Sequence, residues 1–568
     1  MKYLLSLFLC LGIKAAAQVS IPQFDNLGKD TMVPVPIHIS PKGYMVGYTY
    51  YEYCTNVICF NDGMRVSVFD KNGTLATSIS FEKPANNTSV SSRLFVHDAV
   101  FDNNNDLILA GTFHSEINFD PNHTTATLLT GNTEFSNTTD IFLAKYSIPD
   151  GKLKWVKVMS GSNNPLLFFS HLTVDKNNNI YLLGSKLSGT FDLNPGPATV
   201  PVTSPFIARY SATGDYLASK PVGDISTQYY RSLRYTNNQL ILLTNEDSSG
   251  KKTFSMKQYD PNTLNVIKAK KFGMFNEDNI STGRRKAYDF VFGKNEIWML
   301  GEHTNYLYMY TATGTISQSL AANERAFFIA RLDTSWNIQE AKMLHKTKNP
   351  YYCPVKLGID SLNNLMVIGS VIDSLDADLG NGTYWVKPTA GANKSCGYML
   401  YYDNNLTLQW AKTFGEAAGS NVSLAAFDAG KNIYVSGTFK GTANFSMTGT
   451  PANHTSLLAN ANLYHARYVW NTAKQPTGIL NRPSAELLAT VYPNPAADAL
   501  YISLKGQAIN TSELTCTVYD TKGSMVQTQT TGTGNNVQIS LTSLPPAQYY
   551  LHITDGKAIN ETHRFLKR

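Results

Sequence analysis

A short pattern that recurs seven times constrains the fold of this 568-residue chain more than any other feature. Most copies have a turn rich in Asn and Asp, then a run of apolar residues and, in six copies, a glycine; Gly43–Gly47 is a shortened first copy. The glycine, or the threonine that replaces it once, stands at positions 47, 111, 184, 244, 301, 369 and 437. Successive copies are therefore 57 to 73 residues apart. Such regular recurrence is typical of repeat proteins, in which each unit buries its apolar face against its neighbours.

Each repeat has a second half that also reads as strands. An aromatic and apolar run such as Phe206–Tyr210 is followed by a turn and a further strand such as Leu153–Lys157 or Leu408–Lys412. One repeat therefore supplies about four short antiparallel strands, and radial closure protects the edges of such sheets. The sequence predicts an all-β fold, a β-propeller of seven blades with four antiparallel strands each. The last copy lacks an evident fourth strand after Tyr468, and we expect residues 33–39 to help close the ring.

Composition agrees with a β-rich chain. Charged residues make up 16% of the sequence and aromatic residues 11%, whereas charged residues are about 25% of average proteins. Few charges and many aromatic residues exclude a disordered chain, a coiled coil and a helical bundle. The net charge of +6 is too small for its length to predict nucleic-acid binding.

The N-terminus has the features of an export signal. Lys2 precedes a short apolar core, Tyr3–Ile13, and Ala15–Ala17 supply the small residues that signal peptidase requires. We predict a signal peptide at residues 1–17 with cleavage before Gln18. The apolar core is shorter than the roughly 20 residues that a membrane span needs, and no later stretch predicts a transmembrane segment.

The C-terminal residues differ from the repeats. We predict a β-propeller at 18–472, a linker at 473–486 and a separate domain at 487–568, in which short alternating strands joined by Asp/Gly turns indicate a small β-sandwich. This domain holds two distinctive motifs and a basic end. The motif residues are Tyr492, Pro493, Asn494 and Pro495 in the first motif and Tyr519, Asp520 and Gly523 in the second.

Residues 487–568 resemble the type A C-terminal sorting domain of the type IX secretion system of Bacteroidetes. The resemblance rests on those two motifs, on a Leu-x-x-Leu-Pro run and on the basic C-terminus. It implies that the domain is an address for the type IX secretion machinery, which carries the protein across the outer membrane. The expected location is extracellular or on the outer cell surface, after export to the periplasm.

The repeats also resemble those of secreted bacterial propellers, in which Gly-x-Phe leads to an Asp-Phe-Asp-Pro-Gly-like segment. Here Gly111–Phe113 precedes Asn118–Pro121, and a related segment runs from Phe191 to Gly196. This resemblance implies the architecture and says little about activity, because propellers have many unrelated functions.

Two kinds of loop are candidates for calcium. Asp102, Asn104 and Asp106 alternate as in a calcium loop, but Leu107 stands where such a loop needs glycine and no glutamate closes it. A hairpin turn rich in Asn and Asp is therefore favoured over a metal site. The loops with Asp120 and with Asp192 and Asn194 could bind calcium or a sugar, although packing at the strand ends is favoured.

No catalytic or cofactor-binding residue is predicted. The eleven histidines are scattered, and the sequence has no His-x-His, His-Glu-x-x-His, Cys-x-x-Cys, Gly-x-Ser-x-Gly or phosphate-loop motif. We favour a module that binds a glycan or a protein. The alternative is a secreted polymer-degrading enzyme, a glycan hydrolase or lyase, because a propeller can assemble a site from different blades.

Cysteines and net charge give two further expectations. Cys54 and Cys59 flank a short loop and could form a disulfide in an oxidising compartment. Residues 484–568 are neutral and the leader has two lysines, so the remaining residues have a net charge of +4. We therefore expect a ligand to be held by aromatic stacking and neutral hydrogen bonds, with little dependence on salt.

Overall fold

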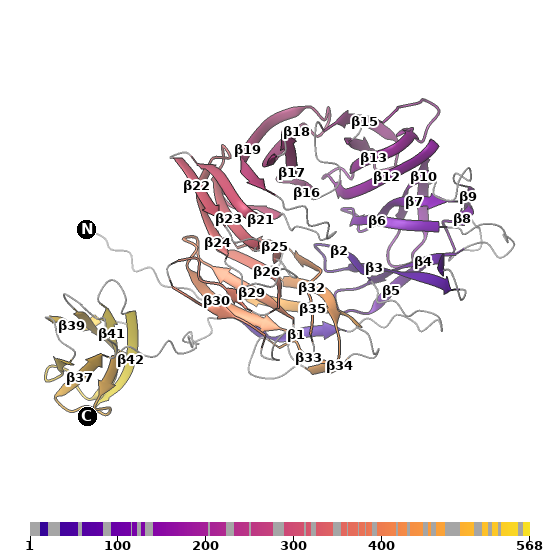
Figure 1. Cartoon of the computed structure of the whole chain (residues 1–568). Helices are drawn as coiled ribbons and strands as arrows, with labels where there is room; N and C mark the ends of the chain where they lie inside the picture. Colours follow the sequence, from indigo (N-terminus) through magenta and orange to yellow (C-terminus); the bar gives the residue numbers. More distant parts are fainter. Residues whose placement is uncertain are drawn as a thin grey trace. The chain divides into compact units, whose positions relative to one another are not determined.

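Every regular element among the described residues is a β-strand, so the predicted all-β class is confirmed. The chain divides into two units, Met1–Pro476 and Thr477–Arg568, in this computed structural model (Figure 1). The structure describes residues 12–20, 35–54, 59–82, 93–114, 116–121, 127–130, 140–202, 205–222, 232–248, 251–276, 289–311, 314–319, 325–344, 354–360, 362–372, 374–380, 382–388, 395–415, 419–428, 432–446, 453–455, 462–471, 489–504, 514–520, 525–531, 536–554 and 560–568.

Four-stranded antiparallel sheets follow one another along the first unit, and most pair their strands in chain order. The first sheet contains β2 (Val35–Ile39), β3 (Met45–Cys54), β4 (Cys59–Phe69) and β5 (Leu75–Glu82). The second contains β6 (Arg93–Phe101), β7 (Leu107–His114), β10 (Asp140–Tyr146) and β11 (Leu153–Met159). The third contains β12 (Gly161–Val174), β13 (Ile180–Phe191), β14 (Phe206–Tyr210) and β15 (Tyr216–Pro221). The sixth contains β25 (Pro354–Ile359), β26 (Leu365–Val371), β29 (Cys396–Tyr402) and β30 (Leu408–Phe414).

The fourth and fifth sets of strands are joined in one nine-stranded sheet. The fourth set is β16 (Ser232–Thr236), β17 (Gln239–Ser248), β18 (Lys251–Tyr259) and β19 (Val266–Asn276). The fifth is β20 (Asp289–Phe292), β21 (Glu296–Thr311), β23 (Arg325–Asp333) and β24 (Ile338–Leu344). They join because β21 extends beyond β20 and pairs there with both β19 and β22 (Gly314–Ser319).

The last sheet of this unit takes a strand from the N-terminal end of the chain. Its order is β1 (Gly12–Ser20), β35 (Asn462–Asn471), β32 (Asn432–Phe439) and β31 (Leu424–Phe427). The described part of residues 33–39, the segment expected to help close the ring, does not supply this strand. Val35–Ile39 is β2, which turns directly into β3 and so takes the first place in the first sheet.

Strand β1 overlaps the predicted signal peptide. Cleavage before Gln18 would remove its first six residues and leave Gln18–Ser20, which pair with His465–Arg467. The register of β1 shifts between Lys14 and Gln18, so the part that would remain forms a separate run of pairs.

Short pairs of strands extend the loops between the second and third strands of three sheets. They are β8 (Glu116–Asn118) with β9 (Leu128–Thr130), β27 (Leu375–Asp376) with β28 (Trp385–Val386), and β33 (Thr442–Asn444) with β34 (Asn453–Thr455).

Apolar side chains from consecutive sheets pack into shared clusters. Leu109 packs with residues of the first sheet, and Leu143 packs with residues of the third. Comparable clusters join each later pair of consecutive sheets. A further cluster joins the last sheet to the first through Tyr434, Met45 and Ile39. Strands such as β7 and β26 are buried along their whole length, because their sheets are covered on both faces.

The glycine of the repeat makes room for an aromatic ring. Gly111 of β7 lies opposite Phe142 of β10, and a Cβ atom on Gly111 would overlap that ring and the carbonyl oxygen of Phe95. The same aromatic–glycine pairing recurs in four other repeats, as Phe206–Gly184, Phe328–Gly301, Tyr398–Gly369 and Tyr464–Gly437. The first half of each of these repeats thus supplies the glycine, and the second half supplies the aromatic ring that packs against it.

The second unit consists of two antiparallel sheets with a common core, as predicted for the C-terminal sandwich. One sheet contains β36 (Ala489–Tyr492), β37 (Ala499–Leu504) and β40 (Asn536–Ser540). The other contains β38 (Leu514–Tyr519), β39 (Met525–Thr531), β41 (Ala547–Thr554) and β42 (Asn560–Lys567). Ile502 and Ile539 from the first sheet pack with Val518, Leu551 and Phe565 from the second.

Candidate functional site

The strand register defines one equivalent position in the first strand of each repeat, opposite the residue that precedes the repeat glycine. We call the seven residues at this position the first-strand set. Six of them are polar, whereas the residue that follows each is apolar. The set is His38, Asp98, His171, Ser232, Asp289, Lys356 and Leu424.

The two aspartates of this set connect neighbouring first strands. Asp98 Oδ2 accepts a hydrogen bond from the Leu172 N–H at 2.6 Å, which joins β6 to β12. Asp289 Oδ2 accepts one from the Leu357 N–H at 2.7 Å, which joins β20 to β25. In both cases Oδ1 accepts the N–H of the next residue of its own strand. The set therefore lies where consecutive first strands meet.

Two cations face the carboxylate of Asp289. The Arg234 guanidinium pairs with Oδ1, and Lys356 Nζ lies 3.7 Å from Oδ2. Arg234 also donates to the Phe290 carbonyl oxygen at 3.0 Å and lies over the Phe290 ring. The Asp289 side chain is 1% exposed, whereas Arg234 and Lys356 are 30% and 25% exposed. We call Arg234, Asp289 and Lys356 the Asp289 cluster; its formal charge is positive.

Burial and charge shift two pKa values at this cluster. Burial, and then the charge of Arg234, lower the pKa of Lys356 to about 8, although Asp289 opposes the shift. Burial and the charge of Lys356 lower the pKa of His38 to about 4, so this imidazole is neutral at pH 7. His38 Nε2 is buried and has no hydrogen-bond partner among the described residues.

Two histidines lie near the equivalent aspartate of the second repeat in the sequence and the strand register. His171 holds the neighbouring position of the set, and His97 precedes Asp98 in the chain. His97 Nε2 lies 3.0 Å from Thr112 Oγ1, and burial lowers the pKa of His97 to about 4. His97 is therefore neutral at pH 7.

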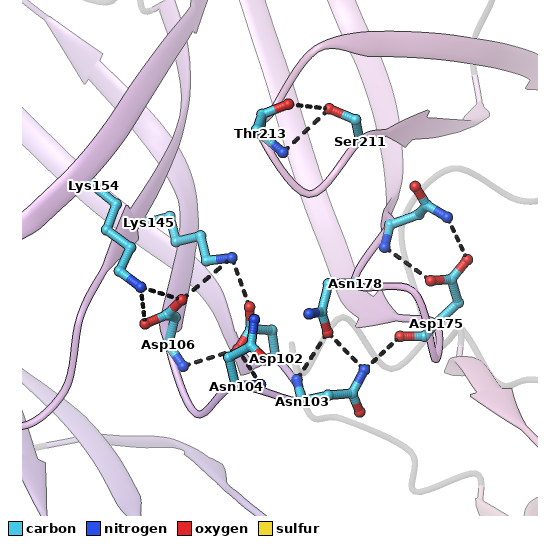
Figure 2. A network of polar contacts seen from close by, with 11 residues as sticks. Asp102, Asn103, Asn104, Asp106, Lys145, Lys154, Asp175, Asn178, Ser211 and Thr213 are labelled. Atoms are coloured by element: carbon cyan, nitrogen blue, oxygen red, sulfur yellow. Dashed lines mark hydrogen bonds and ion pairs between the residues drawn. The ribbon is translucent and has the colours of Figure 1, made fainter.

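The first calcium candidate forms a hairpin turn held by its own carboxylate. Asp102 Oδ1 accepts the N–H groups of Asn104 and Asp106, each at 2.9 Å. Lys145 Nζ lies 2.6 Å from Asp102 Oδ2, and Lys154 Nζ lies 2.7 Å from Asp106 (Figure 2). Backbone amides and lysines thus engage the oxygens that calcium would require.

The same turn recurs through the first unit. An aspartate accepts N–H groups two and four residues later at Asp70, Asp175, Asp360 and Asp403. Figure 2 also shows Asn103 bonded to Asn178 and to the Asp175 carbonyl oxygen, which links two successive turns. These contacts are those that the hairpin-turn interpretation predicts.

The other candidate loops are fixed at the ends of strands. Asp192 Oδ1 accepts the N–H groups of Asn194 and Val200, and the Tyr210 hydroxyl donates to the Leu193 carbonyl oxygen. In the preceding repeat Asp120 Oδ1 lies 3.4 Å from the Leu153 nitrogen, and the Tyr146 hydroxyl donates to the Phe119 carbonyl oxygen. Asp376 forms an equivalent loop, with Tyr402 donating to Ala377, that the sequence analysis missed.

The remaining candidates are possible metal ligands and the two cysteines that are predicted to form a disulfide. Within the described ranges, no three His, Cys, Asp or Glu side chains gather closely enough to hold a metal ion. Cys54 and Cys59 lie opposite each other in the pairing of β3 with β4. Their disulfide stays a prediction.

The Tyr-Pro-Asn-Pro motif of the second unit holds the last strand. Asn494 Nδ2 donates to the Arg564 carbonyl oxygen at 2.9 Å, and Asn494 Oδ1 accepts the Leu566 N–H at 3.0 Å. Cis peptide bonds precede Pro493 and Pro495 on either side of this asparagine.

The second motif begins at the end of β38. Tyr519 pairs with Tyr550 of β41, and Asp520 follows it. Gly523 lies outside the described residues.

Residues 490–568 match the family of secretion system C-terminal sorting domains. This part of the chain is therefore a sorting domain of the type IX secretion system, as the two motifs and their resemblance indicated. No curated protein matches the sequence. Among the described residues, no helix has the length and apolar character to cross a membrane.

Several solved structures are similar to the chain at 9% sequence identity. The polysaccharide lyase Uly1 aligns over 78% of this chain and 91% of its own, with a TM-score of 0.36. The extracellular domain of the putative hybrid two component system BT3049 from B. thetaiotaomicron aligns over 96% and 99%, with a TM-score of 0.13. The exotype rhamnogalacturonan lyase YesX aligns over 78% and 91%, with a TM-score of 0.26.

Sequence reasoning missed the Asp289 cluster altogether. A signal was present, because Asp98, His171 and Lys356 each stand four residues before the aspartate of a hairpin turn. Aligning the repeats on that aspartate would have shown a polar position inside an apolar strand. It would not have shown that Arg234 reaches Asp289 from the preceding repeat.

Proposed function

We propose that this chain is an exported, seven-bladed β-propeller that works as a binding module on the outer cell surface or outside the cell. The match of residues 490–568 to the sorting-domain family supports the export route. The proposed organisation is a leader at 1–17, the propeller at 18–472, a linker at 473–486 and the sorting domain at 487–568. The source would be a Bacteroidetes-like bacterium.

Contacts between the first and last sheets support the propeller. Strand β2 contacts β31 of the last sheet as well as β6 of the second. The apolar cluster of Tyr434 and Met45 lies between the same two sheets, and β1 pairs the N-terminal end of the chain with β35. Such contacts are those of a ring of sheets, which leaves no sheet without a neighbour.

In this architecture the first strands are the innermost strands of the blades. The first-strand set would then surround the propeller axis, and the Asp289 cluster would be a charged site at the centre. This arrangement of charged side chains from three successive repeats is the observation that best supports a binding role. The partner would be an extracellular glycan or protein.

One observation favours an enzymatic alternative. Burial and the charge of Arg234 lower the pKa of Lys356 to about 8, close to the range in which a general base works. A secreted glycan hydrolase or lyase could use such a lysine. Turnover of any polysaccharide by the purified mature chain, lost in K356M, would favour this alternative over a binding role.

Export can be tested apart from binding. A chain that ends at Glu486 lacks the sorting domain, and we expect it to accumulate in the periplasm while the full chain reaches the cell surface or medium. Cell fractionation and immunoblotting measure the distribution. Protease resistance of the periplasmic species checks that the first unit is folded. Normal appearance of the truncated chain outside the cell would contradict the proposed route.

A further inference from the structure

We propose that the Asp289 cluster binds the carboxylate of an acidic ligand, with Lys356 as the main contact. This assignment rests on the proposed binding role and names the class of ligand for it. Three features of the cluster support it: an excess of positive charge among the described residues, a lysine ammonium that is only 3.7 Å from one carboxylate oxygen, and a neutral histidine nearby.

Within the part of the chain that the structure describes, the charge of the cluster is unbalanced. Arg234 and Lys356 contribute two positive charges, and Asp289, which both of them approach, contributes one negative charge. A single bound carboxylate would balance this excess. Charged groups inside proteins are costly unless they are paired, so the cluster favours a singly charged ligand over a dianion such as phosphate.

The two cations differ in the donors that they have left. Arg234 uses its guanidinium on Asp289 and on the Phe290 carbonyl oxygen. Lys356 Nζ has Asp289 at 3.7 Å, and an ammonium group has three N–H donors. The Lys356 side chain is 25% exposed and the Asp289 side chain 1% exposed, so a ligand would approach the cluster from the side of Lys356.

His38 adds a neutral group close to the same ammonium. The charge of Lys356 contributes to the lowered pKa of His38, so the two side chains interact electrostatically. An imidazole that is neutral at pH 7 can donate one hydrogen bond to a carboxylate. Strand β31, which contacts both β2 and β25, has the sequence Leu424–Phe427 and no titratable side chain.

Calorimetric titration of the mature chain with sodium glucuronate tests the proposal, with glucose as the matched neutral sugar and inorganic phosphate as a second anion. We expect glucuronate to bind more tightly than either at pH 7. K356M should weaken glucuronate binding about tenfold or more, as loss of a charge-assisted hydrogen bond predicts. K356R should keep most of the affinity, and the exposed lysine variant K220M should match the unchanged chain.

Binding should also weaken as the pH rises from 7 to 9, because the Lys356 ammonium loses its proton over this range. Thermal unfolding of each variant checks that it is folded. Glucuronate binding no tighter than glucose binding, or unchanged in K356M, would overturn the proposal. A binding role through other residues would still be visible as capture of a neutral glycan on an array, so failure of this site differs from failure of the proposed function.

Discussion

Asp98 and Asp289 occupy the same position in two repeats and make the same backbone hydrogen bonds, and two cations lie beside Asp289. Each accepts the N–H of a leucine in the next first strand. Asp289 then faces Arg234 and Lys356, whereas Asp98 follows the neutral His97.

The comparison teaches that the repeat fixes the geometry of a position and leaves its chemistry free. The bond from the aspartate to the next strand depends only on the register and spacing of neighbouring sheets. The charge around it depends on side chains from two further repeats, which vary independently. A structural contact in one repeat can therefore be part of a binding site in another.

The largest expected effect comes from removing each aspartate. D289A leaves Arg234 and Lys356 facing each other without their carboxylate, and loss of one partner of a buried ion pair costs about 3–5 kcal/mol. D98A loses hydrogen bonds to backbone amides, which costs about 1–3 kcal/mol. Urea unfolding followed by fluorescence compares the two variants. Equal losses would show that the cations add nothing to the role of Asp289.

Alkaline pH should stabilise the Asp289 cluster. The pKa of Lys356 is about 8 in the folded chain against an ordinary value of 10.5, so the unfolded chain binds the proton more tightly. The cost of burying this charge is present below pH 8 and disappears between pH 8 and 10.5, a gain of roughly 2–3 kcal/mol. The unchanged chain should gain stability relative to K356M over this interval. Parallel pH profiles from urea unfolding would contradict the assignment.

Acid should lower the stability of the folded chain through His97, the residue that precedes Asp98. The pKa of His97 is about 4 when folded and 6.5 ordinarily, so the unfolded chain takes up the proton first. Stability should fall as the pH decreases from 6.5 to 4, by an amount that we place at roughly 2 kcal/mol. H97Q keeps a polar group for Thr112 and should lose less stability over this range. Thermal unfolding at a series of pH values measures the difference, and identical acid sensitivity would speak against His97.

The smallest effect on stability is expected when the neighbourhood of Asp98 is given a lysine at the position that Lys356 holds near Asp289. H171K places a lysine beside Asp98 at the position that corresponds to Lys356. A partly exposed ion pair contributes about 0–1 kcal/mol, so stability should change little. Because the added lysine supplies only one of the two cations found at the Asp289 cluster, this variant should gain no second glucuronate site. Calorimetry that shows two sites in H171K would mean that excess positive charge is not the requirement.

Much of the architecture was predictable because its signals are local. The repeat glycine and the aromatic residue opposite it lie within one repeat, and a hairpin turn such as that of Asp102 is held by an aspartate within five residues. The sorting domain was recognisable from short motifs in a fixed order. Asn494 illustrates why such a motif is informative, because its side chain is hydrogen-bonded to the last strand.

Pairing between distant parts of the chain was not predictable in this way. Strand β1 completes the last sheet by pairing with β35, more than 400 residues away, whereas β2 pairs with β3, the next strand along the chain. Both segments have suitable composition, so the sequence pattern could not decide which of them pairs with β35.

The sequence by itself determined the strand repeat, the turn chemistry and the sorting domain, because hydrophobic periodicity and hydrogen bonds between near neighbours specify them. Only the tertiary structure decided where charge gathers. Arg234, Asp289 and Lys356 are more than 50 residues apart in sequence and meet because consecutive first strands pack side by side. A net charge summed over the chain could not show this cluster, since electrostatic interactions depend on distance in space and not on composition.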